Sequence, residues 1–94
     1  MKFDWFRLKA ESNLKDHGVS FEEAATVFDD PLVDIAPDVL HSFDETRFVA
    51  VGTSTQCRLL VVVFTERGDT IRIITAREVT PKERRQYESR NYYS

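Results

Sequence analysis

The sequence predicts one α+β domain spanning residues 1–94, with two N-terminal helices, an antiparallel sheet of three to four strands and a C-terminal helix. Three observations predict this class. Two segments with helix-type spacing and capping residues occupy the first third of the chain. Three β-type segments joined by short turns follow, and strands connected in this way pair antiparallel. A further capping sequence near residue 80 marks one more helix.

Two helices are expected before the sheet. The first spans Arg7–His17, where apolar residues are spaced among charged ones, and Gly18 supplies the left-handed residue that commonly closes a helix. The second begins at Ser20, because Ser20 and Glu23 form a capping-box pair, and it ends before the proline of an Asp-Asp-Pro sequence. The preceding residues 3–5 form either an edge strand or an apolar anchor.

Residues 47–51, 58–65 and 70–76 are the expected strands. The segment 58–65, RLLVVVFT, is almost wholly apolar, which is typical of a central strand covered on both faces. The segment 70–76 alternates, so its odd-numbered positions are expected to share one face (Ile71, Ile73 and Thr75). Residues 31–46 are acidic and irregular, and they are expected to form a loop with at most one short strand at 32–36.

The last helix is marked by its first residues. The Thr-Pro-Lys-Glu sequence that starts at Thr80 combines an N-cap, a proline at the first helical position and a capping-box glutamate. The helix is expected to run to about Arg90, and residues 91–94 are expected to fray. Its apolar face is thin and consists mainly of Tyr87.

Charge is distributed unevenly along the chain. The net charge of −3 by itself argues against a nucleic-acid partner. However, residues 1–57 carry five Lys or Arg and eleven Asp or Glu, whereas residues 58–94 carry eight Lys or Arg and five Asp or Glu. An acidic half joined to an arginine-rich half indicates one surface for an anion and another for a different partner.

Composition excludes several classes of protein and site. With 94 residues, of which 41% are hydrophobic, the chain is expected to fold around a single core. Cys57 is the only cysteine, which excludes a disulfide framework and a multi-cysteine zinc site and indicates a reducing compartment. No apolar run approaches the roughly 18 residues of a membrane span, and no signal core opens the chain, so a cytoplasmic location without membrane contact is expected. His17 and His41 lie in no metal-binding motif, and neither a metal nor another cofactor is expected.

Arginines of the second half are the main candidates for a functional site. Arg72 is expected to share a strand face with Ile74, and because isoleucines occupy both faces the strand is expected to be largely covered. Arg72 is then either a phosphate ligand or a rim residue paired with an acidic residue of 29–45. Arg77 lies between that strand and the last helix, whose first N–H groups favour an anion. Three further residues on that helix are spaced so that they can cluster (Glu83, Arg84 and Tyr87).

The reaction that suits such a cluster is RNA cleavage without a metal, in which the 2′-hydroxyl of the substrate attacks the adjacent phosphate. The protein then supplies positive charge to the developing phosphorane and moves two protons. Arginines are suited to the first task (Arg72, Arg77 and Arg84). The candidate proton carriers are a carboxylate, a phenol, an imidazole and an amine (Glu83, Tyr87, His17 and Lys9). The sequence does not distinguish the base from the acid.

The segments NLKDHGVSFEEAATVFDDPL, ETRFVAVGTS and RLLVVVFTERGDTIRIITAREVTPKERRQYE resemble the BrnT (DUF497) family of toxins. The resemblance covers about residues 2–88. Its most specific parts are the sequence around KDHGVSFEEA, the Glu-x-Arg before the first of the three strands, and the ending RIITAREVTPKERRQY.

The resemblance implies a RelE-like fold, endoribonuclease activity that halts translation, and neutralisation by a co-expressed BrnA-type antitoxin. Because that antitoxin carries a ribbon-helix-helix domain, the resemblance implies that operator DNA is bound only through it. Matching positions imply site roles for basic residues (Arg47, Arg72, Arg77 and Arg84), for two residues of the ending motif (Glu83 and Tyr87) and for one of the opening motif (His17). RNA binding is expected from Arg47 together with three further basic residues (Arg58, Lys9 and Arg85).

A second class of function fits the same residues. The arginines of the second half can dock an acidic segment of a partner protein without any catalysis, either as a binding module or as an inactive toxin kept for autoregulation of its operon. The salt dependence of RNA binding and the toxicity of the chain without its partner distinguish the two classes.

Overall fold

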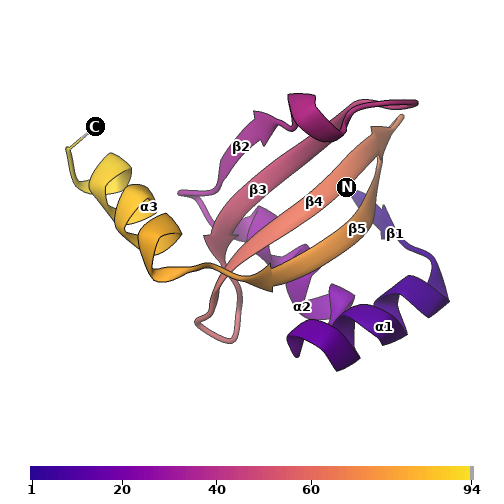
Figure 1. Cartoon of the computed structure of the whole chain (residues 1–94), viewed down its shortest axis with the longest axis horizontal. Coiled ribbons are helices and arrows are strands. Elements are labelled where there is room, and N and C mark those ends of the chain that lie inside the picture. Colours follow the sequence, from indigo (N-terminus) through magenta and orange to yellow (C-terminus); the bar gives the residue numbers. More distant parts are fainter. Residues whose placement is uncertain (94) are drawn as a thin grey trace.

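In the described part of the chain, five strands form one mixed sheet in the order β1-β5-β4-β3-β2 (Figure 1). The computed structural model describes the backbone of residues 1–93 and the side chains of residues 1–90. Its strands are β1 (Lys2–Asp4), β2 (Asp34–Pro37), β3 (Arg47–Thr53), β4 (Leu59–Arg67) and β5 (Thr70–Glu78). Its helices are α1 (Arg7–His17), α2 (Phe21–Ala25) and α3 (Pro81–Tyr93), with 3-10 turns η1 (Thr26–Asp29) and η2 (Val39–His41).

The expected α+β class, with two helices in the first third of the chain and one at its end, is confirmed, although β1 precedes the two helices. The prediction of a wholly antiparallel sheet of three to four strands is wrong, because β1 and β2 extend the sheet at its two edges and β1 pairs with β5 in parallel. Both edge strands are very short, at three and four residues. Segments of that length are too short for a repeating pattern that would reveal the partner strand or its direction.

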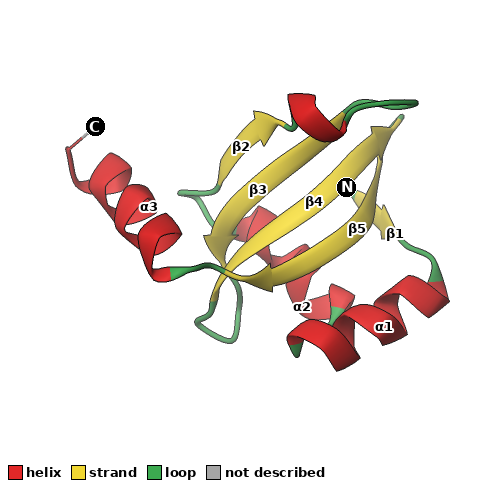
Figure 2. Ribbon diagram, in the orientation of Figure 1, coloured by secondary structure: helices red, strands yellow, loops and turns green. Residues whose placement is uncertain are grey.

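The core lies between one face of the sheet and the two N-terminal helices (Figure 2). Phe21, Ala24 and Val27 are fully buried against the inward-facing residues of β4, among them Leu60 and Val62. The helix α3 instead extends from the end of β5 and leaves most of the opposite sheet face open (Figure 2). In the described part of the chain, no helix has the length and apolar character needed to cross a membrane.

A bulge in β5 changes which of its residues face the core. Val63 of β4 lies opposite Thr75, whereas the next residue, Phe64, lies opposite Ile73, so one residue of β5 is left unpaired. As a result Ala76 is fully buried in the core and Thr75 is not. The expectation that Thr75 shares a face with the two buried isoleucines of this strand is therefore wrong.

The two capping boxes have different outcomes. At α3, Thr80 N–H donates to Glu83 Oε1 (2.8 Å) and Glu83 N–H donates to Thr80 Oγ1 (3.2 Å), which is the full reciprocal box. At α2, only the Ser20 hydroxyl accepts from Glu23 N–H (3.0 Å), because the Glu23 carboxylate is used elsewhere. The second helix is also shorter than expected, since it tightens into the 3-10 turn η1 at Thr26.

Residues 31–46 contain the short strand that was allowed at 32–36, which the structure places at Asp34–Pro37 as β2. They also contain the turn η2, which was not expected. Fraying was expected over residues 91–94. The backbone of residues 91–93 continues α3, and Ser94 lies outside the described residues.

Asn13 completes the edge of the sheet where β1 ends. β1 covers β5 only from Thr70 to Arg72. Beyond that point Asn13, which is buried, donates from Nδ2 to the carbonyls of Ala76 (2.8 Å) and Val19 (3.0 Å) and accepts from Ala76 N–H (3.1 Å). The side chain thus takes the place of a neighbouring strand and fixes α1 to β5.

We expect Asn13→Ala to lower the free energy of unfolding by about 3 kcal/mol, because it leaves buried backbone groups without hydrogen bonds. Urea unfolding followed by circular dichroism measures this change. The control is Ser12→Ala on the same helix. Among the described residues its side chain makes one hydrogen bond, an exposed one to Asp16, so the change should cost less than about 0.5 kcal/mol. Equal effects of the two substitutions would contradict the role of Asn13.

Candidate active site

A hollow of ≈ 440 Å³ lies on the open face of the sheet, opposite the core, and is called the sheet pocket here. It lies between the outward-facing residues of β3, β4 and β5, the turn η2 and the start of α3. Its floor is mainly aliphatic and its rim is charged. The lining residues are Asp38, His41, Arg47, Val49, Val61, Val63, Ile74, Thr75, Arg77 and Glu83.

Sheet register explains why these residues meet. Residues directly opposite each other on neighbouring strands point to the same face. Val61 lies opposite Arg77, and Val63 lies opposite both Val49 and Thr75, so these side chains share the open face. An aliphatic floor lowers the local dielectric, which strengthens any electrostatic contact made at the rim.

Arg77 is fixed at the rim by Glu83. Its Nη1 donates to Glu83 Oε1 (2.8 Å) and its Nη2 donates to Oε2 (2.9 Å), a two-point pairing across the junction of β5 and α3. The Arg77 guanidinium, followed by the Thr80 N–H, lowers the pKa of Glu83 to about 2. The same contact raises the pKa of Arg77.

This pairing changes the expected role of Glu83. A carboxyl with so low a pKa is ionised at neutral pH, so it has no proton to donate, and it accepts one only weakly. Glu83 is therefore better suited to positioning Arg77 and to capping α3 than to carrying a proton.

An aspartate–histidine pair forms the other side of the pocket. His41 Nδ1 lies 3.0 Å from both carboxylate oxygens of Asp38. When Nδ1 carries the proton and donates it to Asp38, Nε2 is left as a proton acceptor. The backbone is fixed locally, because the Ser42 hydroxyl donates to the Asp38 carbonyl (2.7 Å) and accepts from Arg47 N–H (2.9 Å).

Arg47 begins β3 and lines the same pocket. Among the described residues, no acidic side chain forms an ion pair with its guanidinium, unlike those of Arg72 and Arg77. This guanidinium is therefore free to bind an anion that enters the pocket.

A smaller hollow of ≈ 170 Å³ adjoins the sheet pocket beneath α3 and shares Glu83 with it. There the Tyr87 hydroxyl lies 3.3 Å from Asp30 Oδ2 and from the Leu32 carbonyl. Burial, followed by the Asp30 charge, raises the pKa of Tyr87. The phenol is thus neutral near pH 7 and serves to attach α3 to the segment before β2.

In the described part of the chain, no group of three or more His, Cys, Asp or Glu is arranged to hold a metal ion.

The family model described as "Ribonuclease toxin, BrnT, of type II toxin-antitoxin system" matches residues 5–83. The chain belongs to the BrnT family. A crystal structure of the Brucella abortus ribonuclease toxin BrnT superposes on it with a TM-score of 0.67 and 20% sequence identity, covering 85% of this chain and 97% of that one. At that identity the likeness concerns the fold. No curated protein matches the chain significantly by sequence.

In this BrnT-family chain the sheet pocket brings together three of the site residues predicted from sequence, Arg47, Arg77 and Glu83. Tyr87 lines the adjoining hollow. Arg84 lies outside both and pairs with Glu88 one helical turn away (3.8 Å), so it does not cluster with Glu83 and Tyr87 as expected.

Arg72 is held at the N-terminal edge of the sheet. Its Nε and Nη2 donate to the two carboxylate oxygens of Asp4 (2.9 and 3.1 Å), and its guanidinium carbon lies 4.5 Å from the centre of the Phe6 ring. The partner expected for it in residues 29–45 is thus replaced by Asp4, which sequence reasoning could not anticipate without the parallel pairing of β1 with β5. Arg72 joins these two strands and does not line the sheet pocket.

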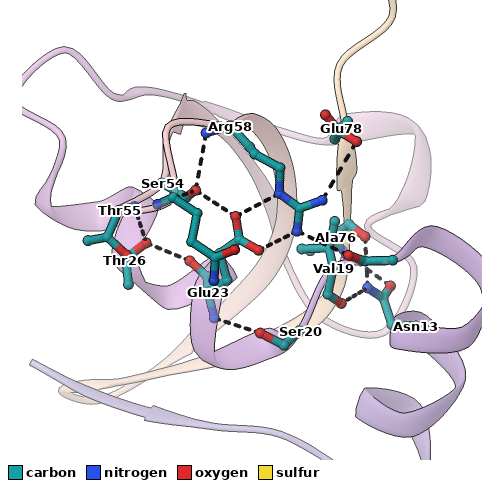
Figure 3. A network of polar contacts seen from close by, with 12 residues as sticks. Asn13, Val19, Ser20, Glu23, Thr26, Ser54, Thr55, Arg58, Ala76 and Glu78 are labelled. Carbon is teal, nitrogen blue, oxygen red and sulfur yellow. Dashed lines mark hydrogen bonds and ion pairs between the residues drawn. The ribbon is translucent and has the colours of Figure 1, made fainter.

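Arg58 is part of a polar network that joins α2 to the loop between β3 and β4 (Figure 3). Both Nε and Nη2 donate to the carboxylate of Glu23, and Nη2 also donates to the Gly18 carbonyl (3.0 Å). Glu23 has a side chain only 2% exposed and also accepts from the Ser54 hydroxyl (2.6 Å). The structure therefore gives Arg58, expected to contact RNA, a role in holding α2 to the β3–β4 loop.

The remaining predicted residues lie at two other places. His17 and Lys9 line a small hollow beside α1, which meets the sheet pocket only at the β5 bulge. Arg85 lies with Lys82 on a shallow surface of α3.

Sequence reasoning missed Asp38 and His41 as site residues. The only local signal was an aspartate and a histidine three positions apart, within a segment expected to be irregular. Their contribution became visible only once β3 placed that segment beside Arg77.

Proposed function

We propose that this chain is an endoribonuclease toxin whose active site is the sheet pocket. The observation that carries the proposal is the convergence of two arginines, Arg47 and Arg77, with the His41–Asp38 pair on a concave aliphatic surface. Membership of a family of ribonuclease toxins supports RNA as the substrate. We also propose that the fold is RelE-like, as the resemblance to the family implies.

The proposed reaction uses the substrate's own 2′-hydroxyl, so it requires no metal-bound water. His41 Nε2 accepts the 2′ proton as the 2′ oxygen forms a bond to phosphorus. Arg47 and Arg77 stabilise the negative charge of the phosphorane. The bond from phosphorus to the 5′ oxygen then breaks, and that oxygen takes up one proton from the imidazolium or from water. The products are a 2′,3′-cyclic phosphate and a 5′-hydroxyl.

The biological setting is also part of the proposal. A toxin of a type II system is neutralised by an antitoxin. We infer that this antitoxin is a BrnA-type ribbon-helix-helix protein, and that the pair binds operator DNA only through the antitoxin. Cleavage of RNA in the cytoplasm would halt translation and arrest growth.

One observation favours a second candidate, an inactive toxin that retains only its binding function. Both terminal nitrogens of Arg77 are engaged by Glu83, so a phosphate would have to share or displace that carboxylate. Activity of the wild-type chain separates the two candidates.

The test is cleavage of an end-labelled RNA by the purified chain. We expect wild type to cleave with EDTA present, and Arg47→Ala and Arg77→Ala each to reduce the rate by about 100-fold or more, since each removes a cation from the phosphorane. The matched control is Arg84→Ala, an exposed arginine outside the pocket, expected within about twofold of wild type.

A substrate with one 2′-deoxynucleotide at the cleaved position should be resistant there. Cleavage at that position, or an Arg77→Ala variant as active as the Arg84→Ala control, would contradict the proposed site. Absence of cleavage by a folded wild-type chain would favour the inactive toxin.

A further inference from the structure

Exposed apolar side chains gather in one segment, residues 34–43, called here the docking segment. It runs from the edge strand β2 through the turn η2 to Phe43 (Figure 1). Val39 and Leu40 are each 80% exposed and Phe43 is 85% exposed, while Ile35 is 48% exposed. A surface with so many large apolar side chains in ten residues is costly to leave in water, and it is typical of a site for another protein.

The same segment presents an open backbone edge. β2 is the last strand of the sheet, bonded only to β3. Asp38 N–H donates to the Arg47 carbonyl (2.7 Å), and backbone groups in an antiparallel pair alternate in direction, so those of Ile35 point away from β3. Pro37 has no N–H to offer, which limits the edge to a short partner strand and opposes uncontrolled sheet extension.

Charge identifies the kind of partner. Residues 29–45 contain six acidic residues and no Lys or Arg. Some of these acids are satisfied within the chain, such as Asp34 by Arg90 and Glu45 by Arg67. Asp29 and Asp44, by contrast, have no ion pair among the described residues. A partner segment carrying both apolar and basic side chains complements this surface.

We propose that the docking segment binds an extended, basic and apolar segment of the antitoxin, which adds as a strand beside β2 and covers Val39, Leu40 and Phe43. The antitoxin is the expected partner because the chain belongs to a family of type II toxins. It would bind by adding a strand to the open edge of the sheet. Asp38 and His41 lie within the docking segment and also line the sheet pocket. A partner bound there lies against the proposed active site and would block it. That blocking effect rests on the proposed function, whereas the contact between the two proteins does not.

The experiment measures affinity between the purified chain and the antitoxin encoded beside it, by calorimetric titration. We expect Phe43→Lys to raise the Kd by about 30-fold or more, as for a central apolar contact residue. Asp44→Lys should raise it by about tenfold and reduce its salt dependence. The control is Leu8→Lys on α1, an equally apolar side chain that is 69% exposed and lies outside the segment, expected within about twofold of wild type. Amide exchange at Ile35 should slow in the complex.

Three results would overturn the inference. One is a Phe43→Lys variant that binds the antitoxin as tightly as Leu8→Lys does. Another is unchanged exchange at Ile35 in the complex. The third concerns the chain without its partner. If Phe43→Lys converts a sedimenting dimer to a monomer and leaves antitoxin affinity unchanged, this surface is a contact between two copies of the chain. Because binding is measured without RNA, an inactive wild type would overturn the proposed function and leave this test intact.

Discussion

Arg58→Ala is expected to lower the free energy of unfolding by about 3–5 kcal/mol, because it leaves the Glu23 carboxylate buried without its cation. In a domain of this size such a loss shifts the thermal midpoint by more than about 12 °C. Differential scanning calorimetry and urea unfolding measure it. The variant tests whether Arg58 serves the fold, as its contacts indicate, or RNA binding, as expected from sequence.

Two controls make the measurement specific. Arg67→Ala breaks an ion pair with Glu45 in which both side chains are well exposed, and it should cost less than about 1 kcal/mol. The double variant Glu23→Met with Arg58→Met replaces both charges by apolar side chains of similar size and should recover most of the loss. A single Arg58→Ala variant as stable as Arg67→Ala would contradict the structural role.

The pH dependence of stability should change sign in the same variant. In the native chain the Arg58 guanidinium, opposed by burial and assisted by Ser54, holds the pKa of Glu23 below its ordinary value of 4.5. Its contribution to stability is therefore present above pH 4.5 and is lost as pH falls through the lower folded value. In Arg58→Ala burial acts without the cation and raises that pKa, so the variant should gain stability as pH falls from 7 towards 5.

His41→Gln is expected to reduce the rate of RNA cleavage by about 10²–10⁴-fold, the usual contribution of a positioned acid or base. Because the His41 side chain is 63% exposed, the fold should be unaffected. Asp38→Asn should reduce the rate by about 10–100-fold through loss of imidazole orientation. Single-turnover cleavage of a labelled RNA measures both rates.

The other histidine provides the control. His17→Gln, at the end of α1 beside the small hollow of Lys9, should leave cleavage within about twofold of wild type. If His17→Gln is inactive and His41→Gln is active, the reaction takes place beside α1 and not in the sheet pocket.

The candidate site was only partly predictable from the sequence. Arg77 and Glu83 were found because they flank a helix start whose capping residues are adjacent in the chain. Arg58 was predicted to contact RNA, and Arg72 was left as either a phosphate ligand or an ion-paired rim residue, since a sequence shows the charge of a side chain but not its partner. Their partners, Glu23 and Asp4, come from segments far away in the chain.

What the sequence determined by itself is the local structure: the exact span of α1 with Gly18 at its end, the capped start of α3 and the three long strands. These features depend on residues within a few positions of one another. Only the tertiary structure decided which charged side chains form ion pairs that stabilise the fold and which are available to bind a substrate. The bulge in β5 and the register of β3 set the face on which Arg47, Arg77 and His41 meet. Such choices depend on contacts between distant strands, where a shift of one residue turns a side chain from the core to the open face.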